Sequence, residues 1–310
     1  MTIRFPQIYQ QKAPTFSFEF FPPKTDAAQQ RLRDNVTELK ALGPTYVTCT
    51  YGAGGSTRQQ TGQIVAELAR ELQVPAAAHL TCVGNSREQL IEVLEGFAAQ
   101  GIANIVALRG DAPAADASSG GVATFEPHPE GLRYANELVT LIRERFGDTF
   151  GIAVAGYPEG HIETPSRLTD LDNLKRKVDA GADMVMTQLF FDNRDFYDFV
   201  ERCELAGITV PIVAGIMPIV TRAGIMKMAG LCGARLPSKL LKKLQAAGDD
   251  DEKVARVGID WATRQCHDLL EHHVRGIHFY TLNRSNATIE IYRRLGATDS
   301  QTLADIAGDG

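Results

Sequence analysis

The chain has 310 residues, of which 44% are hydrophobic and 23% charged, and its formal net charge is -6. This composition is typical of a soluble globular protein with a large core, arranged as one α/β barrel or as two domains. The mildly acidic balance and the single tryptophan argue against nucleic acid or an anionic membrane as a partner. No apolar run approaches the roughly 20 residues that a membrane helix needs, and residues 1–12 lack the apolar segment of a signal peptide.

Strand-like and helix-like segments alternate along almost the whole chain. The predicted strands are near-continuously apolar, as expected when both faces are covered, and cover residues 15–21, 46–51, 75–82, 102–108, 151–157, 183–191, 211–218 and 278–283. Helical spacing and capping signals predict helices over residues 26–42, 58–72, 85–101, 130–146, 164–181, a segment after 193, and 287–295. Helical pieces are predicted over residues 221–247 and 250–274. The helix at 85–101 is expected to begin with a capping box of Asn85 and Glu88. We expect a lid or binding loop over residues 112–129 and a frayed, flexible tail over residues 296–310.

Roughly eight βα units without a break in composition predict a single closed parallel (β/α)8 barrel over about residues 15–295. The alternative is a doubly wound open sheet, which normally has fewer strands and one ligand crevice. Polar residues end nearly every predicted strand, and this favours the barrel, whose sites lie at the carboxyl ends of the strands.

The segment over residues 15–23 is predicted to be a short strand that stops at two prolines. Because side chains alternate along a strand, its even-numbered phenylalanines would share one face and Ser17, Glu19 and Phe21 the other. Burial among aromatic rings favours the protonated form of a carboxyl group, which makes Glu19 a candidate general acid. The alternative is a partly exposed acid on an edge strand.

The five cysteines are widely spaced and form no CxxC pair, so we expect reduced, mostly buried thiols in a cytoplasmic protein and no zinc site. No two of the strand-end histidines have metal-ligand spacing, no acidic cluster resembles a magnesium site, and no Ser or Cys lies in a nucleophile elbow. The strand ends instead suit an organic ligand with phosphates and a heterocycle. The residues collected there are Glu19, Thr50, Tyr51, His79, Arg109, Asp111, Tyr157, His161, Gln188, Tyr280 and Arg284.

Two further features are weak as motifs. The turn Gly52–Gly55 is neither a GxGxxG nor a P-loop sequence. Arg176 and Lys177 follow Asp170 and Asn173 in one predicted helix, and on spacing alone they are typical of a solvated helix face.

Eight short motifs occur in order: FSFEFFPP (16–23), VTCTYG (47–52), AHLTC (78–82), VALRGD (106–111), YPEGH (157–161), NLKRKVDAGA (173–182), TQLFFD (187–192) and HFYTLNR (278–284). Together they resemble the methylenetetrahydrofolate reductase family. The resemblance covers about residues 15–295, and the length resembles the short bacterial form, with nothing after residue 296 to form the regulatory domain of longer eukaryotic relatives.

The resemblance implies a (β/α)8 barrel that holds FAD without a Rossmann motif and reduces 5,10-methylenetetrahydrofolate to 5-methyltetrahydrofolate. The reductant would be NADH or NADPH, used in a ping-pong sequence that feeds one-carbon metabolism and methionine synthesis. The expected partners are therefore small molecules, folate and a nicotinamide dinucleotide, and a homo-oligomer is compatible with this expectation. The alternatives are a reductase that passes hydride directly without flavin and a non-catalytic folate-binding subunit.

The resemblance also implies residue roles. Glu19 matches the acid that helps to open the five-membered ring of the folate, and Asp111 matches a carboxylate whose charge favours a cationic iminium intermediate. The flavin-contact positions are Thr50, Tyr51, Ala53, His79, Arg109, Gly110, Asp111, Tyr134, Ala135, Tyr157, His161, Asp170, Asn173, Arg176 and Lys177. The substrate side comprises Glu19, Thr50, Asp111, Gln188, Tyr280, Leu282 and Arg284. The segment 220–224 lacks the glutamine that meets folate in some relatives, and Met228 falls where an aromatic residue can stack.

Overall fold

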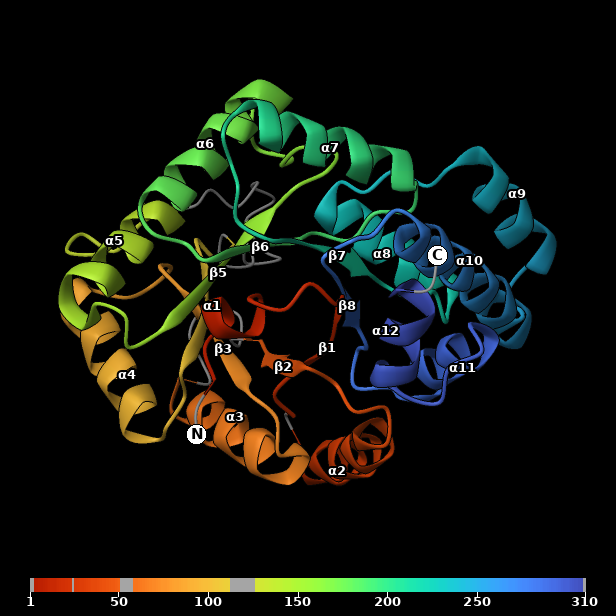
Figure 1. The fold of residues 1–310 in the computed structure, drawn as a ribbon, viewed down its shortest axis with the longest axis horizontal. Helices are drawn as coiled ribbons and strands as arrows, with labels where there is room; N and C mark the ends of the chain where they lie inside the picture. Colours follow the sequence, from red (N-terminus) through yellow and green to blue (C-terminus); the bar gives the residue numbers. More distant parts are fainter. Residues whose placement is uncertain (1–2, 24, 51–57, 112–125, 309–310) are drawn as a thin grey trace, which may run out of the picture.

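The computed structural model describes residues 3–23, 25–50, 58–111 and 126–308. Eight parallel strands form a closed barrel in which each strand pairs with the next and β8 pairs with β1 (Figure 1). The helices form an outer ring around the strands (Figure 1). The predicted (β/α)8 barrel is therefore confirmed, and the open-sheet alternative is wrong.

The strands are β1 (Thr15–Phe20), β2 (Tyr46–Cys49), β3 (Ala76–Thr81), β4 (Asn104–Leu108), β5 (Gly151–Gly156), β6 (Met184–Thr187), β7 (Ile212–Ile216) and β8 (Gly276–Tyr280). The helices are α1 (Phe5–Ile8), α2 (Asp26–Lys40), α3 (Arg58–Leu72), α4 (Arg87–Ala99), α5 (Ala135–Phe146), α6 (Arg167–Asp179), α7 (Asn193–Leu205), α8 (Arg222–Cys232), α9 (Ser238–Ala247), α10 (Asp251–Glu271), α11 (Asn286–Arg294) and α12 (Ser300–Gly308). None of these described helices is both long enough and apolar enough to cross a bilayer.

The side chains of β1 alternate between two faces, as predicted. Phe16, Phe18 and Phe20 are fully buried in the main hydrophobic core. Ser17 and Glu19 point the other way, where both approach His278 of β8. A closed barrel has no edge strand, so the alternative of an exposed edge acid at Glu19 is wrong.

The amino-terminal end of the barrel is closed by α1, a helix that the sequence analysis did not predict (Figure 1). Phe5 packs edge-on against Tyr46 with ring centroids 5.2 Å apart. The Asn104 side chain accepts a hydrogen bond from the Phe5 N–H at 2.7 Å and donates one to the Ile3 carbonyl at 2.9 Å. A candidate site therefore belongs at the opposite, carboxyl end of the strands.

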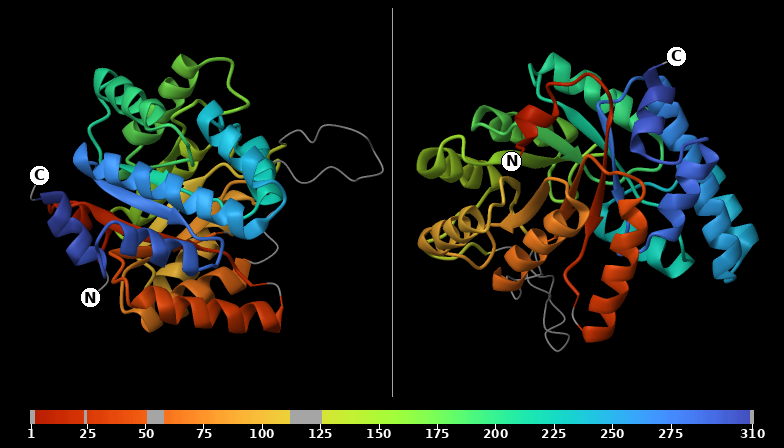
Figure 2. Two further views of the ribbon diagram at one scale, coloured as in Figure 1. Left: turned by 90° about the vertical axis from the view of Figure 1, so that its right-hand side faces the viewer. Right: turned by 60° about the horizontal axis from the view of Figure 1, so that its bottom comes forward.

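The predicted flexible tail is wrong for residues 300–308, which form α12. Leu303 is fully buried, and the Ser300 N–H donates to the Leu42 carbonyl at 2.8 Å. The Asp299 carboxylate accepts from the Thr302 N–H at 2.8 Å and so caps the first turn. Figure 2 shows α10, α11 and α12 together on one side of the barrel.

Two predicted boundaries are also corrected. The capping box of α4 is formed by Ser86 and Gln89, one residue later than predicted. The helical pieces predicted over residues 221–247 are two helices, because Gly233 adopts φ +71° and ends α8. The eighth strand ends at Tyr280 rather than at residue 283, since the next residues turn away with positive φ angles. The five cysteines are free, and all except the half-buried Cys232 are buried.

Candidate functional site

One carboxyl group and two imidazoles meet at the carboxyl ends of β1, β3 and β8; we call Glu19, His79 and His278 the central cluster. Glu19 is 4% exposed, and its Oε2 lies 3.4 Å from His79 Nε2 and 3.6 Å from His278 Nε2. Both imidazole Nε2 atoms are buried without a hydrogen-bond partner among the described residues. Burial lowers the pKa of His79, with Glu19 opposing and His278 adding to the shift, so His79 is neutral at neutral pH.

The loop after β8 is fastened to the end of β1 and so borders Glu19. Thr281 Oγ1 donates to the Glu19 carbonyl at 2.6 Å. The Asn283 amide donates to the Phe21 carbonyl and accepts from the Phe21 N–H, both at 2.8 Å. These bonds hold Leu282 and Asn283 at φ +52° and +55°, a region that residues other than glycine seldom adopt. Leu282 is half-buried there, and Arg284, two residues on, is exposed.

Tyr280 lies beside His278, with the two rings perpendicular and 5.1 Å apart. Its hydroxyl donates to the Thr187 carbonyl at 2.7 Å, and burial raises its pKa well above the usual value, with a further contribution from Glu19. A Cβ at Gly215 would lie 2.2 Å from that same carbonyl, so glycine is needed where β6, β7 and β8 converge. Gln188, next to Thr187, is half-buried at the end of β6.

A second group of polar residues lies at the ends of β4 and β5 and on α6; we call Arg109, Tyr157, His161, Asp170 and Lys177 the flanking cluster. The Tyr157 and His161 rings are perpendicular with centroids 4.7 Å apart, and Lys177 Nζ lies 5.8 Å from the Tyr157 ring centre. Lys177 Nζ donates to the Ala155 carbonyl at 2.5 Å.

Burial sets the protonation of the flanking cluster. It lowers the pKa of Lys177 to about 8, opposed by Asp170, and it raises the pKa of Asp170, opposed by Lys177. Burial also lowers the pKa of His161, and the Arg109 charge lowers it further. Arg109 forms an ion pair with Glu163, which raises the arginine pKa. The cluster is thus a half-buried group of cations and acids that can meet a charged ligand.

Arg176 and Lys177 are adjacent in the sequence but lie in different surroundings on α6. The flavin contact that the resemblance implies for both stays a prediction. Asp170 and Lys177 are seven residues apart and share one face of α6, with Asn173 between them on the same side. Arg176 is displaced by about a third of a turn and is exposed, as expected for a solvated face.

The other predicted site residues are spread around the rim. Asp111 is exposed three residues beyond β4, close enough to contribute to the pKa shifts of Arg109 and Tyr157. Gly110 before it has φ +87°, and a Cβ there would lie 2.6 Å from Val83. Tyr134 is 50% exposed at the start of α5, directly before Ala135. The Thr50 N–H donates to the Phe20 carbonyl at 2.9 Å. Tyr51, Ala53, the Gly52–Gly55 turn and residues 112–125 of the predicted loop lie outside the described residues.

The sequence analysis missed the residues that support Glu19, namely Ser17 and His278 in the barrel interior and Thr281 and Asn283 in the loop. Ser17 and His278 are direct neighbours in the pairing of β1 with β8. The available signal was their spacing: each lies two residues before a predicted site residue, Glu19 or Tyr280, and therefore on the same strand face.

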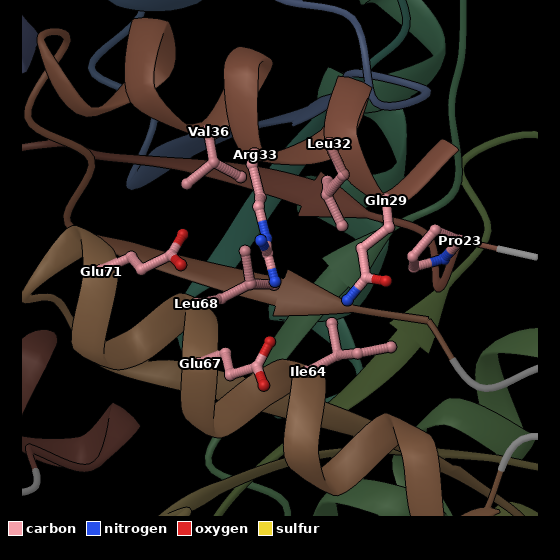
Figure 3. Close-up of a pocket in the computed structure, with 9 residues that line it drawn as sticks. All are labelled: Pro23, Gln29, Leu32, Arg33, Val36, Ile64, Glu67, Leu68 and Glu71. Carbon is pink, nitrogen blue, oxygen red and sulfur yellow. The ribbon is translucent and has the colours of Figure 1, made fainter. Parts of the chain in front are cut away.

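A small pocket lies elsewhere, between α2 and α3 on the outside of the barrel (Figure 3). Leu32 and Val36 of α2 point toward Ile64 and Leu68 of α3, and no predicted site residue lines it. It is a packing gap between helices and has no part in the strand-end site.

Known proteins are similar to this chain in sequence and in fold. The sequence model of the methylenetetrahydrofolate reductase family matches residues 4–296. The chain belongs to this family. The chain is 39% identical over 280 residues to the 5,10-methylenetetrahydrofolate reductase of Escherichia coli, covering 90% of each protein. It is 40% identical over 306 residues to methylenetetrahydrofolate reductase (NADH) 1 of Arabidopsis thaliana, covering 96% of this chain but only 51% of the plant protein.

The chain thus spans about half the length of the plant relatives that it matches. Among solved structures, it is similar to an uncharacterized Clostridium thermocellum protein described as binding two copies of 5-methyl-5,6,7,8-tetrahydrofolic acid. That match has a TM-score of 0.62 at 13% identity and covers 98% of each chain. At this identity the likeness shows the shared barrel fold alone.

Proposed function

We propose that this protein reduces 5,10-methylenetetrahydrofolate to 5-methyltetrahydrofolate, using NADH or NADPH as the donor and bound FAD as the hydride carrier in a ping-pong sequence. The observation that carries the proposal is the buried carboxyl group of Glu19, held between His79 and His278 at the strand ends. Family membership supports the folate substrate, and the name of the Arabidopsis relative supports NADH.

Glu19 is the proton donor in this proposal. Opening the five-membered ring of the folate leaves a nitrogen that must gain a proton, and a protonated carboxyl group can supply it. The low exposure of Glu19 limits exchange of that proton with bulk water. Asp111, an exposed carboxylate beyond β4, supplies negative charge that favours a cationic iminium on the substrate.

The flanking cluster fits FAD by the chemistry of its groups. Lys177 and Arg109 are cations suited to phosphate oxygens, Asp170 can accept hydrogen bonds from a ribose hydroxyl, and Tyr157 offers an aromatic edge. FAD, when bound, would accept hydride from the nicotinamide and deliver it to the methylene carbon of the folate. The residues of the chain would bind and orient the cofactor and the two substrates.

The test is the absorption spectrum of the purified protein, followed by its two anaerobic half-reactions. A flavin spectrum that bleaches with NADH or NADPH and recovers with methylenetetrahydrofolate supports the proposal. A colourless protein that still turns over would favour direct hydride transfer. Failure of turnover after loading with FAD would favour a non-catalytic folate-binding subunit.

A further inference from the structure

The segment between α8 and α9 is tied to the loops after β5 and β6 by one residue, Arg235. Its Nη2 atom donates to Asp195 Oδ2 at 2.8 Å and to Asp192 Oδ2 at 3.3 Å. Its Nε lies 3.8 Å from Glu159 Oε1, and its backbone N–H donates to both carboxylate oxygens of Glu159 at 3.1 Å. Arg235 therefore joins segments that follow β5, β6 and β7.

The three carboxylates are largely shielded from water, since their side chains are only 11%, 11% and 13% exposed. Asp192 has a second ion-pair partner in Arg194, at 2.6 Å. The other ion pair of Asp195 in the described part of the chain is with Arg167, at 3.9 Å. Asp192 and Asp195 bond the same nitrogen of Arg235, so removal of this cation leaves two like charges close together and poorly screened.

The end of α8 also approaches the loop after β5 directly. Gly233, two residues before Arg235, ends the helix with φ +71°. A Cβ at this glycine would lie 2.2 Å from Cγ2 of Ile162, so the backbone passes where no side chain fits. The close contact and the bonds of Arg235 together fix where α8 ends.

The same end of α8 borders the strand-end site. Met228 and Cys232 are four residues apart, share one face of the helix, and pack in the hydrophobic cluster that also holds Tyr280. Burial raises the pKa of Cys232 to about 11, and the charges of Asp111 and Glu19 add to the shift. The Cys232 thiol is therefore near both carboxyl groups, and a displacement of α8 would change the space between them.

We propose that Arg235 is a positioning residue for the folate substrate: its bonds to the loops after β5 and β6 hold the end of α8 beside Tyr280 and Leu282, where Met228 and Cys232 complete one wall of the substrate site. This inference rests on the proposed function, which assigns Tyr280 and Leu282 to the folate side. Because Arg235 lies outside both clusters, its loss should weaken folate binding and leave the chemical step intact.

The first test measures the packing of α8 and needs no turnover. Trp261 is the single tryptophan of the chain and packs in the same hydrophobic cluster. Its Nε1 donates at 2.9 Å to the carbonyl of Phe191, directly before Asp192. Acrylamide should quench its fluorescence lifetime more strongly in Arg235→Ala and in Asp195→Asn than in the wild type. Unchanged quenching in both variants would overturn the inference.

The second test is the dependence of the folate half-reaction on methylenetetrahydrofolate concentration. In Arg235→Ala the apparent Kd should rise about tenfold, because bonds to two charged groups are lost. The limiting rate should stay within about twofold of the wild type. FAD affinity should not change, since the bond from the Arg235 backbone to Glu159 remains. A purely stabilising role would leave the Kd of the folded variant unchanged, and that result would overturn the inference.

Arg194→Ala is the matched control, because this arginine also pairs with Asp192 but is 85% exposed. It should change the Kd by less than about threefold. Arg235→Lys keeps the charge without the planar fork and should recover part of the affinity.

A double variant tests whether the bond between α7 and the α8–α9 segment is the operative link. Arg235→Ala combined with Asp195→Asn should bind folate as weakly as Arg235→Ala alone, since both changes break the same bond. Fully additive losses would show that the two residues act separately and would overturn the inference.

The two proposals fail in different ways. A wild type that reacts with methylenetetrahydrofolate while Arg235→Ala binds it equally well would overturn the role of Arg235 alone. Loss of the folate reaction in the wild type would overturn the proposed function and with it the role of Arg235 toward folate.

Discussion

The central and flanking clusters lie at the same end of the barrel but are built on opposite principles. In the central cluster the Glu19 Oε2 atom lies 3.4 and 3.6 Å from two buried imidazole nitrogens. In the flanking cluster Arg109 is ion-paired and Lys177 lies near Asp170, with solvent close by.

The two clusters therefore suit two different functions, acid catalysis and cofactor binding. Burial away from a fixed cation favours the protonated form of a carboxyl group, which suits acid catalysis. A half-buried mixture of cations and acids exchanges its internal pairs for those of a charged ligand, which suits cofactor binding. Variants in the central cluster should therefore slow one half-reaction, and variants in the flanking cluster should weaken cofactor binding.

The largest effect is expected in the central cluster. Glu19→Gln nearly keeps the shape but removes the proton, so the folate half-reaction should slow by about 10²–10⁴-fold, as is typical when a general acid is lost. Flavin reduction by the nicotinamide donor needs no such proton and should persist. Stopped-flow absorbance times the two half-reactions separately.

Glu290→Gln, at a half-buried position of α11 outside both clusters, is the control for that substitution. Reoxidation of Glu19→Gln by methylenetetrahydrofolate at the wild-type rate would make Glu19 structural. Equal loss of both half-reactions would contradict the division of work between the clusters.

The next largest effect is expected in the flanking cluster. There Lys177 is half-buried, whereas the adjacent Arg176 is exposed. Lys177→Ala should weaken FAD binding by about 10- to 100-fold, because a half-buried charge–phosphate contact is lost. Arg176→Ala, on the exposed face of α6, should change the affinity by less than about threefold. Titration of the apoprotein followed by flavin fluorescence gives both values. Equal losses in the two variants would mean that the pair acts together, as the resemblance to the family implies.

The lowered pKa of Lys177 also sets the direction of a pH effect. Lys177 loses its charge as pH rises through about 8, so FAD affinity should fall above that pH. Lys177→Arg should abolish this fall, because an arginine stays charged. In the apoprotein the unfolded lysine still binds its proton above pH 8 while the folded one does not, so stability should rise between about pH 8 and 10.5. Urea unfolding across that window checks the sign.

The sequence predicted the barrel and the strand face of Glu19 well because both depend on local patterns. Eight apolar segments separated by helical ones define the fold, and alternation along one strand separates Glu19 from the phenylalanines. The contact between Ser17 and His278 beside Glu19 could not be predicted. The two residues are 261 positions apart and meet only when β8 pairs with β1.

Two other regions show what a local pattern omits. Arg176 and Lys177 are adjacent in sequence, but a helix turns about 100° per residue and gives them different surroundings. The tail was expected to be frayed, yet residues 300–308 form α12, whose Leu303 side chain finds a buried place that only the folded barrel provides.

A smaller kinetic effect is expected at the rim between the two clusters. Asp111→Asn should slow the folate half-reaction by about tenfold and flavin reduction less, because the exposed carboxylate acts only on the cationic intermediate and its charge is screened. Adding salt should slow the wild-type folate step toward the rate of the variant. Identical slowing of both half-reactions would place Asp111 in cofactor binding instead.

The smallest kinetic effect is expected far from both clusters, at α12. Leu303→Ala should lower the free energy of unfolding by about 2–4 kcal/mol, because a fully buried leucine is replaced by a cavity. Both half-reactions should keep their rates wherever the variant remains folded. Ile306→Ala is the matched control, since this side chain on the same helix is 45% exposed and its loss should change stability by less than about 0.5 kcal/mol. Urea unfolding compares the two variants. Equal stabilities would show that α12 is not packed as the structure has it, whereas slowed chemistry in folded Leu303→Ala would show that packing at the start of β1 reaches Glu19.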